Sequence, residues 1–429
     1  MSSGAPAPPE SKERARILRR NSFTALRHRD FRLLWIGQLI SVTGSQMQLV
    51  AINWHVYLLT KSPLALGGVG LVRVLPIVFC SLAGGVVADA MDRKRLMLTA
   101  QAIMLVCAGL LAIITGLGRD SLWAIYLLTA IASAAVAFDN PARQALLPTL
   151  VPVEDFPGAV SLGIVVFNSA MIVGPALAGL LLGLQGPALI YGLNAASFIA
   201  VIVALLLMRG GSRAESEIAA AQINFGALRE GLRFVWRTPI IVQTMTLDFI
   251  ATFFASATAL LPIFAAEILN VGPKGLGLLA AAPGAGSVVT GLIMARIGVP
   301  RKQGKTVIAS VAVYGAATVV FGLSQWFWLS LIMLAMVGSS DTVSTVLRQT
   351  IRQMVTPNHL RGRMTSVNMI FFMGGPQLGE FEAGALAALV GATLSVVTGG
   401  LGCLLAVAFA AFWGKSLLSY EGQTSSESA

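Results

Sequence analysis

Residues 84–95, Gly-Gly-Val-Val-Ala-Asp-Ala-Met-Asp-Arg-Lys-Arg, decide how this chain folds. They close an apolar stretch of membrane-span length and place an acid, Asp89, in front of the basic cluster at 93–95. A carboxylate at the end of a helix can meet the positive N-terminal end of a neighbouring helix. A short basic connection also fixes on which side of a membrane a loop lies. The stretch therefore predicts the end of one membrane span and a turn into the next.

The composition of the whole chain indicates a protein that crosses a membrane many times. Of its 429 residues, 56% are hydrophobic and 11% are charged, and the mean hydropathy is +0.78. Soluble domains contain about 25% charged residues. No apolar run shows the period-two alternation of a membrane barrel, so the spans are expected to be helices. The predicted class is an all-α membrane protein.

Several other kinds of site are not expected. The three cysteines lie inside apolar runs, and no Cys/His spacing suits a metal or a disulfide framework. The segment ending in Gly304-Lys305-Thr306 is one residue too long for a phosphate-binding loop and follows no strand, so no cofactor is expected. No catalytic set lies within the spans, which argues against an enzyme. Residues 1–30 lack the apolar region of a signal peptide, so the first span is its own insertion signal.

Twelve apolar segments have the length that a helix needs to cross a hydrocarbon core ~30 Å thick at 1.5 Å per residue. We place them at 33–59, 64–88, 96–116, 121–146, 159–183, 187–208, 240–268, 274–297, 305–325, 327–352, 364–389 and 391–414. The predicted domains are a basic N-terminal tail (1–30), a six-helix bundle (31–208), a linker (209–239), a second six-helix bundle (240–414) and a C-terminal tail (415–429). Alternating apolar and basic residues in the linker predict an amphipathic helix at the membrane surface, although a partner-binding segment has the same pattern.

The positive charges predict the orientation. Of the 30 Lys and Arg residues, only Lys61, Arg119 and Lys274 fall in odd-numbered connections, and Arg73 lies within a span. Positive loops face the cytoplasm, so both termini are predicted there, in a bacterial inner (plasma) membrane. The same loops would meet anionic lipid headgroups, which accounts for the formal net charge of +11 without a nucleic-acid partner.

The two sets of six spans repeat each other. Arg143–Pro152 parallels Arg348–Pro357, and Gly174-Pro175 parallels Gly375-Pro376. Gly291 corresponds to Gly85 in the opening stretch, but Ala295 replaces its acid. Two homologous halves predict a pseudo-symmetric protein with a substrate site between them near the middle of the membrane.

These features resemble the major facilitator superfamily, whose second and third helices are joined by G-x-x-x-D-x-x-G-R-[KR]. Asp92 replaces the usual glycine, a departure also found in the enterobactin exporter and macrolide efflux branch. The resemblance covers residues 31–414 and implies twelve transmembrane helices in two bundles that rock about a central site by alternating access. The matching residues are Gly85, Asp89, Arg93 and Lys94.

The resemblance implies that this loop forms a latch on the cytoplasmic side. Asp89 would meet the end of a neighbouring helix, and Arg93 would pair with Asp139, which lies beside Arg143 at the end of the fourth span. Breaking such contacts would accompany each transport cycle. The alternative is a loop that only sets the topology.

Arg73 in span 2 and Glu380 in span 11 each lie about 15 Å from the outer end of their span. An unpaired charge at that depth costs at least ~2.5 kcal/mol, so a partner is expected. These two spans face each other in the resembled fold, and we expect Arg73 to pair with Glu380, or with Glu382, as an extracellular-side gate. Alternatively, Arg73 binds an anionic group of the substrate or extends to the membrane surface.

Asp248 lies about 14 Å above the inner end of span 7, with no basic residue within one turn of its own helix. Burial penalises the charged form of a carboxylate, which makes Asp248 a candidate for proton coupling. Alternatively, Thr244 or Thr246 caps the carboxylate, or a cation on another helix pairs with it.

Small residues in span 5 resemble the spaced glycine motif of exporters, in which glycines and a proline allow close packing against span 8. Ala178 replaces one glycine of that motif. Ordinary close packing of helices is the alternative explanation. The motif residues are Gly163, Gly174, Pro175 and Gly179.

Polar and aromatic residues of spans 1, 5, 6 and 7 are candidates for the lining of a central substrate cavity. Hydrogen bonds between helices are the alternative role for each of them. The candidates are Gln46, Asn53, Trp54, Asn168, Asn194, Gln243 and Phe253.

The sequence thus predicts a monomeric secondary active transporter that exports a small amphipathic compound, such as a drug or a siderophore-like molecule, in exchange for protons. A lipid or lysophospholipid translocator is the alternative within transport, because Asn140-Pro141-Ala142-Arg143 loosely resembles a segment of lysophospholipid transporters. A membrane-embedded sensor or enzyme is the alternative from another class.

Overall fold

The computed structural model describes residues 22–90, 92–209, 232–256, 258–298, 300–357, 360–413 and 415–420. The predicted tail before residue 22, the part of the linker at 210–231 and the C-terminal residues 421–429 lie outside the described residues. Gly85 and Asp89 belong to a described helix, but their side chains also lie outside the described part.

Long helices make up each half of the protein. The first half contains η1 (Ser22–Arg27), α2 (Arg29–Thr60), α3 (Pro63–Ala90), α4 (Arg93–Gly116), α5 (Leu122–Leu146), η2 (Leu147–Thr149), α6 (Phe156–Gln185) and α7 (Pro187–Leu207). The second half contains α9 (Pro239–Phe254), η3 (Thr258–Leu260), α10 (Leu261–Ile263), η4 (Phe264–Ile268), α11 (Gly272–Ile297), α12 (Gln303–Leu323), α13 (Phe327–Val355), α14 (Arg361–Val390), α15 (Ala392–Trp413) and α16 (Lys415–Leu418).

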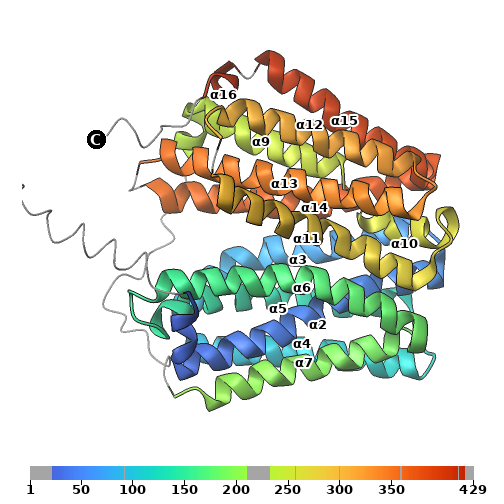
Figure 1. The fold of residues 1–429 in the computed structure, drawn as a ribbon. Coiled ribbons are helices and arrows are strands. Elements are labelled where there is room, and N and C mark those ends of the chain that lie inside the picture. The colour runs from blue at the N-terminus through green and yellow to red at the C-terminus, as the bar shows by residue number, and fades with distance from the viewer. Residues whose placement is uncertain are drawn as a thin grey trace, which may run out of the picture.

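The predicted all-α fold with two six-helix bundles is confirmed, with α9 to η4 forming one interrupted span. Ten helical stretches among the described residues are long and apolar enough to cross a membrane. The two other long helices, α2 and α14, contain more polar residues along their length. Figure 1 shows the first half below the second, with α3 and α6 facing α11 and α14 between them.

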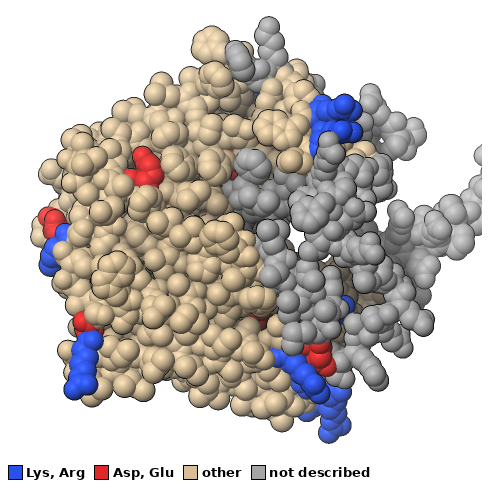
Figure 2. All heavy atoms as spheres, turned by 180° about the vertical axis from the view of Figure 1, so that it is seen from behind, with Lys and Arg blue, Asp and Glu red and all other residues tan. Residues whose placement is uncertain are grey.

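Charge distribution distinguishes the two ends of the molecule. The first and last described helices, η1 and α16, lie toward the left of Figure 1. Helix α7 ends and α4 begins on that side, where Lys94 donates to the Met208 carbonyl, and α12 begins there beside α16. The basic residues 93–95, 209 and 302 belong to these helix ends, and we call this the basic end. We call the other end of the molecule, where residues 61 and 120 lie, the opposite end. On the face seen in Figure 2, charged side chains lie toward these two ends, and other residues form the surface between them. Such a belt suits contact with lipid.

Residue chemistry explains several helix boundaries. Asp92, which replaces the glycine of the resembled signature, is the N-cap of α4 and accepts a hydrogen bond from the Arg95 amide at 3.0 Å. Ser121 caps α5 in the same way. Gly186, at φ 75°, ends α6 and is followed by a proline that begins α7. A carboxylate at residue 92 therefore has a structural role that glycine lacks.

Span 7 differs from the continuous helix that the sequence predicted. α9 ends at Phe254, and the chain resumes as a 3-10 turn and one turn of π-helix, η4. Ser256 in the interruption donates a hydrogen bond to the carbonyl of Pro376 in α14 at 3.1 Å. This bond ties the break in span 7 to α14 at its internal proline, a residue that cannot donate a helical hydrogen bond of its own.

Among the described residues, the two halves share an apolar core toward the opposite end. One cluster there contains Tyr57 and Leu182 of the first half together with Phe264 and Leu276 of the second. Toward the basic end, by contrast, the buried clusters of the described residues belong to one half each. The halves are therefore closed against each other at the opposite end.

Glycines permit this closure. A Cβ atom on Gly179 of α6 would lie 2.6 Å from the Cα atom of Gly277 of α11. A Cβ atom on Gly384 of α14 would lie 2.6 Å from the Cα atom of Gly67 of α3. Real Cβ contacts are not this short, so these crossings require glycine, and helix backbones meet directly. By contrast, Gly163 of the predicted exporter motif faces open space.

We expect Gly179→Ala to separate α6 from α11, because the added methyl group meets backbone that cannot move aside without parting the helices. Overpacking of this kind costs about 1–3 kcal/mol. Spin labels at the exposed residues Leu184 and Leu278 would report the separation as a new population at longer distance. Gly163→Ala on the same helix is the matched control, and an unchanged distance in Gly179→Ala would contradict the proposed contact.

Candidate functional site

An ion pair joins the two halves near the opposite end. Arg73 Nη1 of α3 lies 3.8 Å from Glu380 Oε2 of α14, and both side chains are largely buried. Thr258, just after the break in span 7, donates a hydrogen bond to Glu380 Oε1 at 3.2 Å. Among the described residues, Glu382 makes no ion pair, so of the two acids considered from the sequence it is Glu380 that lies beside Arg73.

A second polar contact between the halves was missed by the sequence analysis. The Tyr57 hydroxyl of α2 donates a hydrogen bond to Glu267 Oε1 at 2.7 Å, and Glu267 belongs to the π-helical turn η4. The Lys61 ammonium lies 4.0 Å from the centre of the Tyr57 ring. A signal was present in the sequence, because both residues lie near the outer ends of the corresponding first spans of the two halves.

A group of buried charges lies inside the second half. Arg348 Nη2 of α13 lies 2.7 Å from Asp248 Oδ1 of α9 and 3.9 Å from Asp341 Oδ1 of its own helix. Arg352 donates from Nε to the Arg348 carbonyl at 3.1 Å and also binds Asn368 of α14. Asp248 thus has a cationic partner on another helix, which was one of the alternatives considered for it.

The first half contains a related arrangement. Arg143, which parallels Arg348 in the sequence repeat, donates to Gln38 Oε1 of α2 at 2.6 Å and to Asn140 Oδ1 at 2.5 Å. Gln38 and Asp248 both lie on the first span of their half, so the arginine binds an amide in one half and a carboxylate in the other. The pseudo-symmetric arrangement is retained, and the carboxylate of the first half, the buried Asp139, lies on the same helix as the arginine rather than on the first span.

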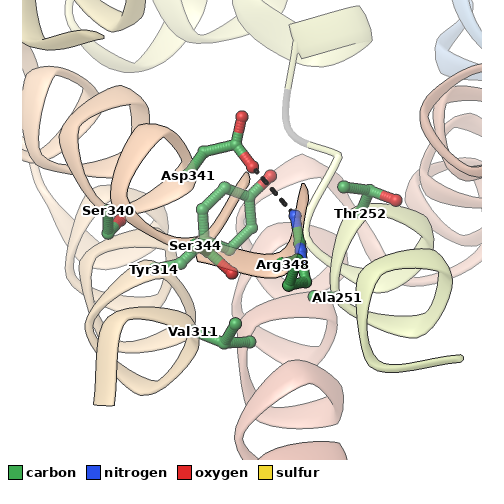
Figure 3. Close-up of a pocket in the computed structure, with 8 residues that line it drawn as sticks. All are labelled: Ala251, Thr252, Val311, Tyr314, Ser340, Asp341, Ser344 and Arg348. Carbon is green, nitrogen blue, oxygen red and sulfur yellow. Dashed lines mark ion pairs between the residues drawn. The ribbon is translucent and has the colours of Figure 1, made fainter. Parts of the chain in front are cut away.

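A small pocket opens beside the charged group of the second half (Figure 3). The centre of a water molecule could move within a volume of about 10 Å³ in this pocket, which is close to the space that one bound water requires. No group of three or more His, Cys, Asp or Glu that could hold a metal exists in the described ranges. The pocket is lined by Ala251, Thr252, Val311, Tyr314, Ser340, Asp341, Ser344 and Arg348.

The predicted latch residues make different contacts from those expected. Arg93 does not bind Asp139: its Nη1 donates to the Ala145 carbonyl at 2.9 Å, and Lys94 Nζ donates to the Met208 carbonyl at 2.8 Å. These carbonyls lie at the C-terminal ends of α5 and α7, where cations are stabilised by the helix dipole. Asp139 instead accepts a hydrogen bond from Gln101 at 3.0 Å.

Two predicted cavity residues lie elsewhere. Asn194 is buried inside the first half and donates to Gln48 Oε1 at 2.7 Å. Gln243 accepts a hydrogen bond from Ser416 near the basic end at 2.6 Å. Their amides are satisfied between helices, which was the alternative role considered for them.

The other cavity candidates lie in spans that face the opposite half. Trp54 is buried, with its ring centre 5.6 Å from that of Tyr57. Gln46 lies against Gly174 of the predicted exporter motif, and Pro175 is one residue further along the buried face of α6. The half-buried candidates are Gln46, Asn53, Asn168 and Phe253.

Comparisons with known proteins agree with this architecture. A family model described as "Transmembrane secretion effector", MFS_3, matches residues 20–427. The multidrug efflux pump Tap of Mycolicibacterium fortuitum is 26% identical over 372 residues, which cover 84% of this chain and 89% of Tap. The enterobactin exporter EntS of Salmonella choleraesuis is 25% identical over 379 residues, which cover 88% of this chain and 90% of EntS.

Solved transporter structures share the fold. A bacterial homologue of the human lysosomal transporter Spinster, inward-facing and unoccupied, superimposes with a TM-score of 0.74 at 13% identity and covers 92% of this chain and 99% of its own. A bacterial homologue of the iron transporter ferroportin, inward-facing, gives a TM-score of 0.70 at 16% identity, with 91% and 99% covered.

We expect Arg348→Gln alone to destabilise the protein by about 3–5 kcal/mol, because it leaves the buried Asp248 carboxylate without its partner. Asp248→Asn alone should cost less, because Asp341 remains 3.9 Å from Arg348 as a second carboxylate. The double variant Asp248→Asn/Arg348→Gln removes both charges and should recover most of that loss. Thermal unfolding in detergent measures all three, with the exposed Arg301→Gln as the control. A double variant as unstable as the sum of the single variants would show that the pair does not couple.

Proposed function

The chain belongs to the transmembrane secretion effector family of the major facilitator superfamily, and we propose that it exports a small amphipathic compound in exchange for protons. The observation that carries the proposal is the position of the contacts between the halves. Among the described side chains, the two polar contacts that cross from one half to the other, Arg73–Glu380 and Tyr57–Glu267, both lie toward the opposite end. Closure at one end is one of the two states that alternating access requires.

Positive charge assigns the two ends to the sides of the membrane. Arg93, Lys94 and Lys302 lie at the basic end, which by the positive-inside rule faces the cytoplasm, together with both termini. The closed end then faces outward, and the substrate enters from the cytoplasm or from the inner leaflet. Basic side chains at this end would also contact anionic headgroups.

The similar proteins support export as the direction. Tap is a multidrug efflux pump and EntS exports enterobactin, and both align along most of this chain. The half-buried candidates Gln46, Asn53, Asn168 and Phe253, of mixed polarity, suit an amphipathic substrate. We propose the buried charges around Arg348 as the coupling site, because ionisable groups inside a membrane mark proton pathways in transporters.

The test is transport in proteoliposomes with an imposed pH gradient. The panel contains fluorescent amphipathic drugs, siderophores and labelled lysophospholipids, and protein-free liposomes are the control. We expect gradient-dependent movement of a drug or a siderophore. Movement of a lysophospholipid without a gradient would replace this proposal with a lipid translocator.

The gate is tested separately. We expect Arg73→Ala and Glu380→Gln each to weaken closure of the opposite end by on the order of tenfold, the population change that about 1.4 kcal/mol produces. Labelling of a cysteine introduced between the halves by a membrane-impermeant reagent measures the closed population. The charge-swapped double variant Arg73→Glu/Glu380→Arg should restore protection, and failure of the swap to rescue either variant would count against the gate.

A further inference from the structure

The two carboxylates beside Arg348 differ in their surroundings. Asp248 is 5% exposed, and its oxygen lies 2.7 Å from the guanidinium. Asp341 is 46% exposed, and its nearer oxygen lies 3.9 Å away from the same group, beyond hydrogen-bonding distance. One arginine therefore binds Asp248 closely and forms only a longer ion pair with Asp341. Figure 3 shows Asp341 and Arg348 on either side of the pocket, joined by this long contact.

Two buried polar groups that line the pocket have no hydrogen-bond partner. The Ser344 hydroxyl and the Nε group of Arg348 are both unpaired, and the two side chains are 2% and 1% exposed. Leaving a buried donor unpaired is unfavourable, so such groups normally bind water. The Asp341 carboxylate itself accepts only a long hydrogen bond, from the Thr345 hydroxyl at 3.5 Å. Because the pocket has room for one water, the two unpaired groups and this carboxylate define a site for a water molecule beside Asp341.

The helices packed around Asp341 bring few other charges to it. α9 contributes Asp248, α12 contributes Tyr314, and α13 itself contributes Arg348 and Arg352. The charged residues of the neighbouring α11, Lys274 and Arg296, lie near its two ends. Arg352 is directed away from Asp341, toward Asn368 and the Arg348 carbonyl. No described cation other than Arg348 thus competes with a proton for Asp341.

We propose that Asp341 is the exchangeable proton site of this protein, that a water in the pocket delivers the proton, and that Asp248 is a fixed counter-ion for Arg348. A hydronium ion in the pocket transfers a proton to a carboxylate oxygen of Asp341, which forms an O–H bond and leaves a neutral water molecule. On release, the same O–H bond breaks and the proton returns to a water molecule. The role of Asp341 in coupling rests on the proposed proton-driven export. The exchanging carboxylate thus belongs to α13 and is not Asp248, the candidate considered from the sequence.

Infrared difference spectroscopy between acidic and alkaline buffer tests the assignment on the whole protein in lipid, without substrate. Protonation of a carboxylate adds a carbonyl stretching band of the acid form. Each of the chain's Asp and Glu residues that titrates between the two buffers contributes to this band, so the assignment rests on the component that a substitution removes. We expect one component of the wild-type band, referred to below as the band, to be lost in Asp341→Asn and to remain at a shifted frequency in Asp341→Glu. Glu154→Gln, at an exposed loop near the basic end, is the matched control and should keep the band. An unchanged band in Asp341→Asn would overturn the proposal.

A second pair of variants separates the two carboxylates. In Asp248→Asn the freed Arg348 turns to Asp341 and keeps it ionised, so the band should vanish although Asp341 is present. In Asp248→Asn/Arg348→Gln the competing cation is gone, and the band should return. If Asp248 were the exchanging carboxylate, the double variant would remain without the band, and the proposal would be overturned.

Transport distinguishes this proposal from the proposed function. Wild-type protein that shows the band but no gradient-driven export would overturn proton-coupled export and leave the assignment of Asp341 standing. Gradient-driven export at an unchanged rate in Asp341→Asn would overturn the assignment and leave proton coupling standing.

Discussion

The cost of placing a charge in a medium without water governs this structure. The buried arginines of the spans each lie beside a polar or acidic partner on another helix. Arg348 binds Asp248, Arg143 binds Gln38, and Arg73 lies beside Glu380. These partners fix how the helices are rotated about their axes, which apolar surfaces alone do not specify when lipid and protein interior are equally apolar. Pairing of charges thus determines the arrangement of the helices and concentrates the functional groups at a few places.

Repetition of the two halves shows how one frame acquires different chemistry. Arg143 and Arg348 occupy related positions near the ends of the fourth span of each half. In the first half the partner is neutral, so the arginine remains a structural cation that also binds Asn140. In the second half the partner is a carboxylate, and another carboxylate lies within reach on the same helix. An imbalance of charge within one half, rather than a new fold, provides the ionisable site.

Much of the fold was predictable, because span length and the Lys/Arg distribution are set by the thickness and polarity of the membrane. The first span, predicted at 33–59, is Arg29–Thr60 in the structure. The pairing of Arg73 with Glu380 could be expected because both lie at the same depth in spans that face each other in the resembled fold. The partner of Asp248 could not, since helices that are apolar on all sides give no period from which to infer their rotation. Nor does Phe254-Ala255-Ser256 contain the glycine or proline that normally marks an interrupted helix.

Part of the seal at the opposite end is made of backbone. Where Gly179 meets Gly277 and Gly67 meets Gly384, no side chain lies between the two helix backbones. Parting the helices at these two crossings requires no change of rotamer, whereas the apolar side chains shared by the halves, such as Tyr57 and Phe264, must separate and pack again. The joint therefore combines backbone surfaces that can part and meet as rigid bodies with a side-chain core whose contacts are lost on opening and regained on closure.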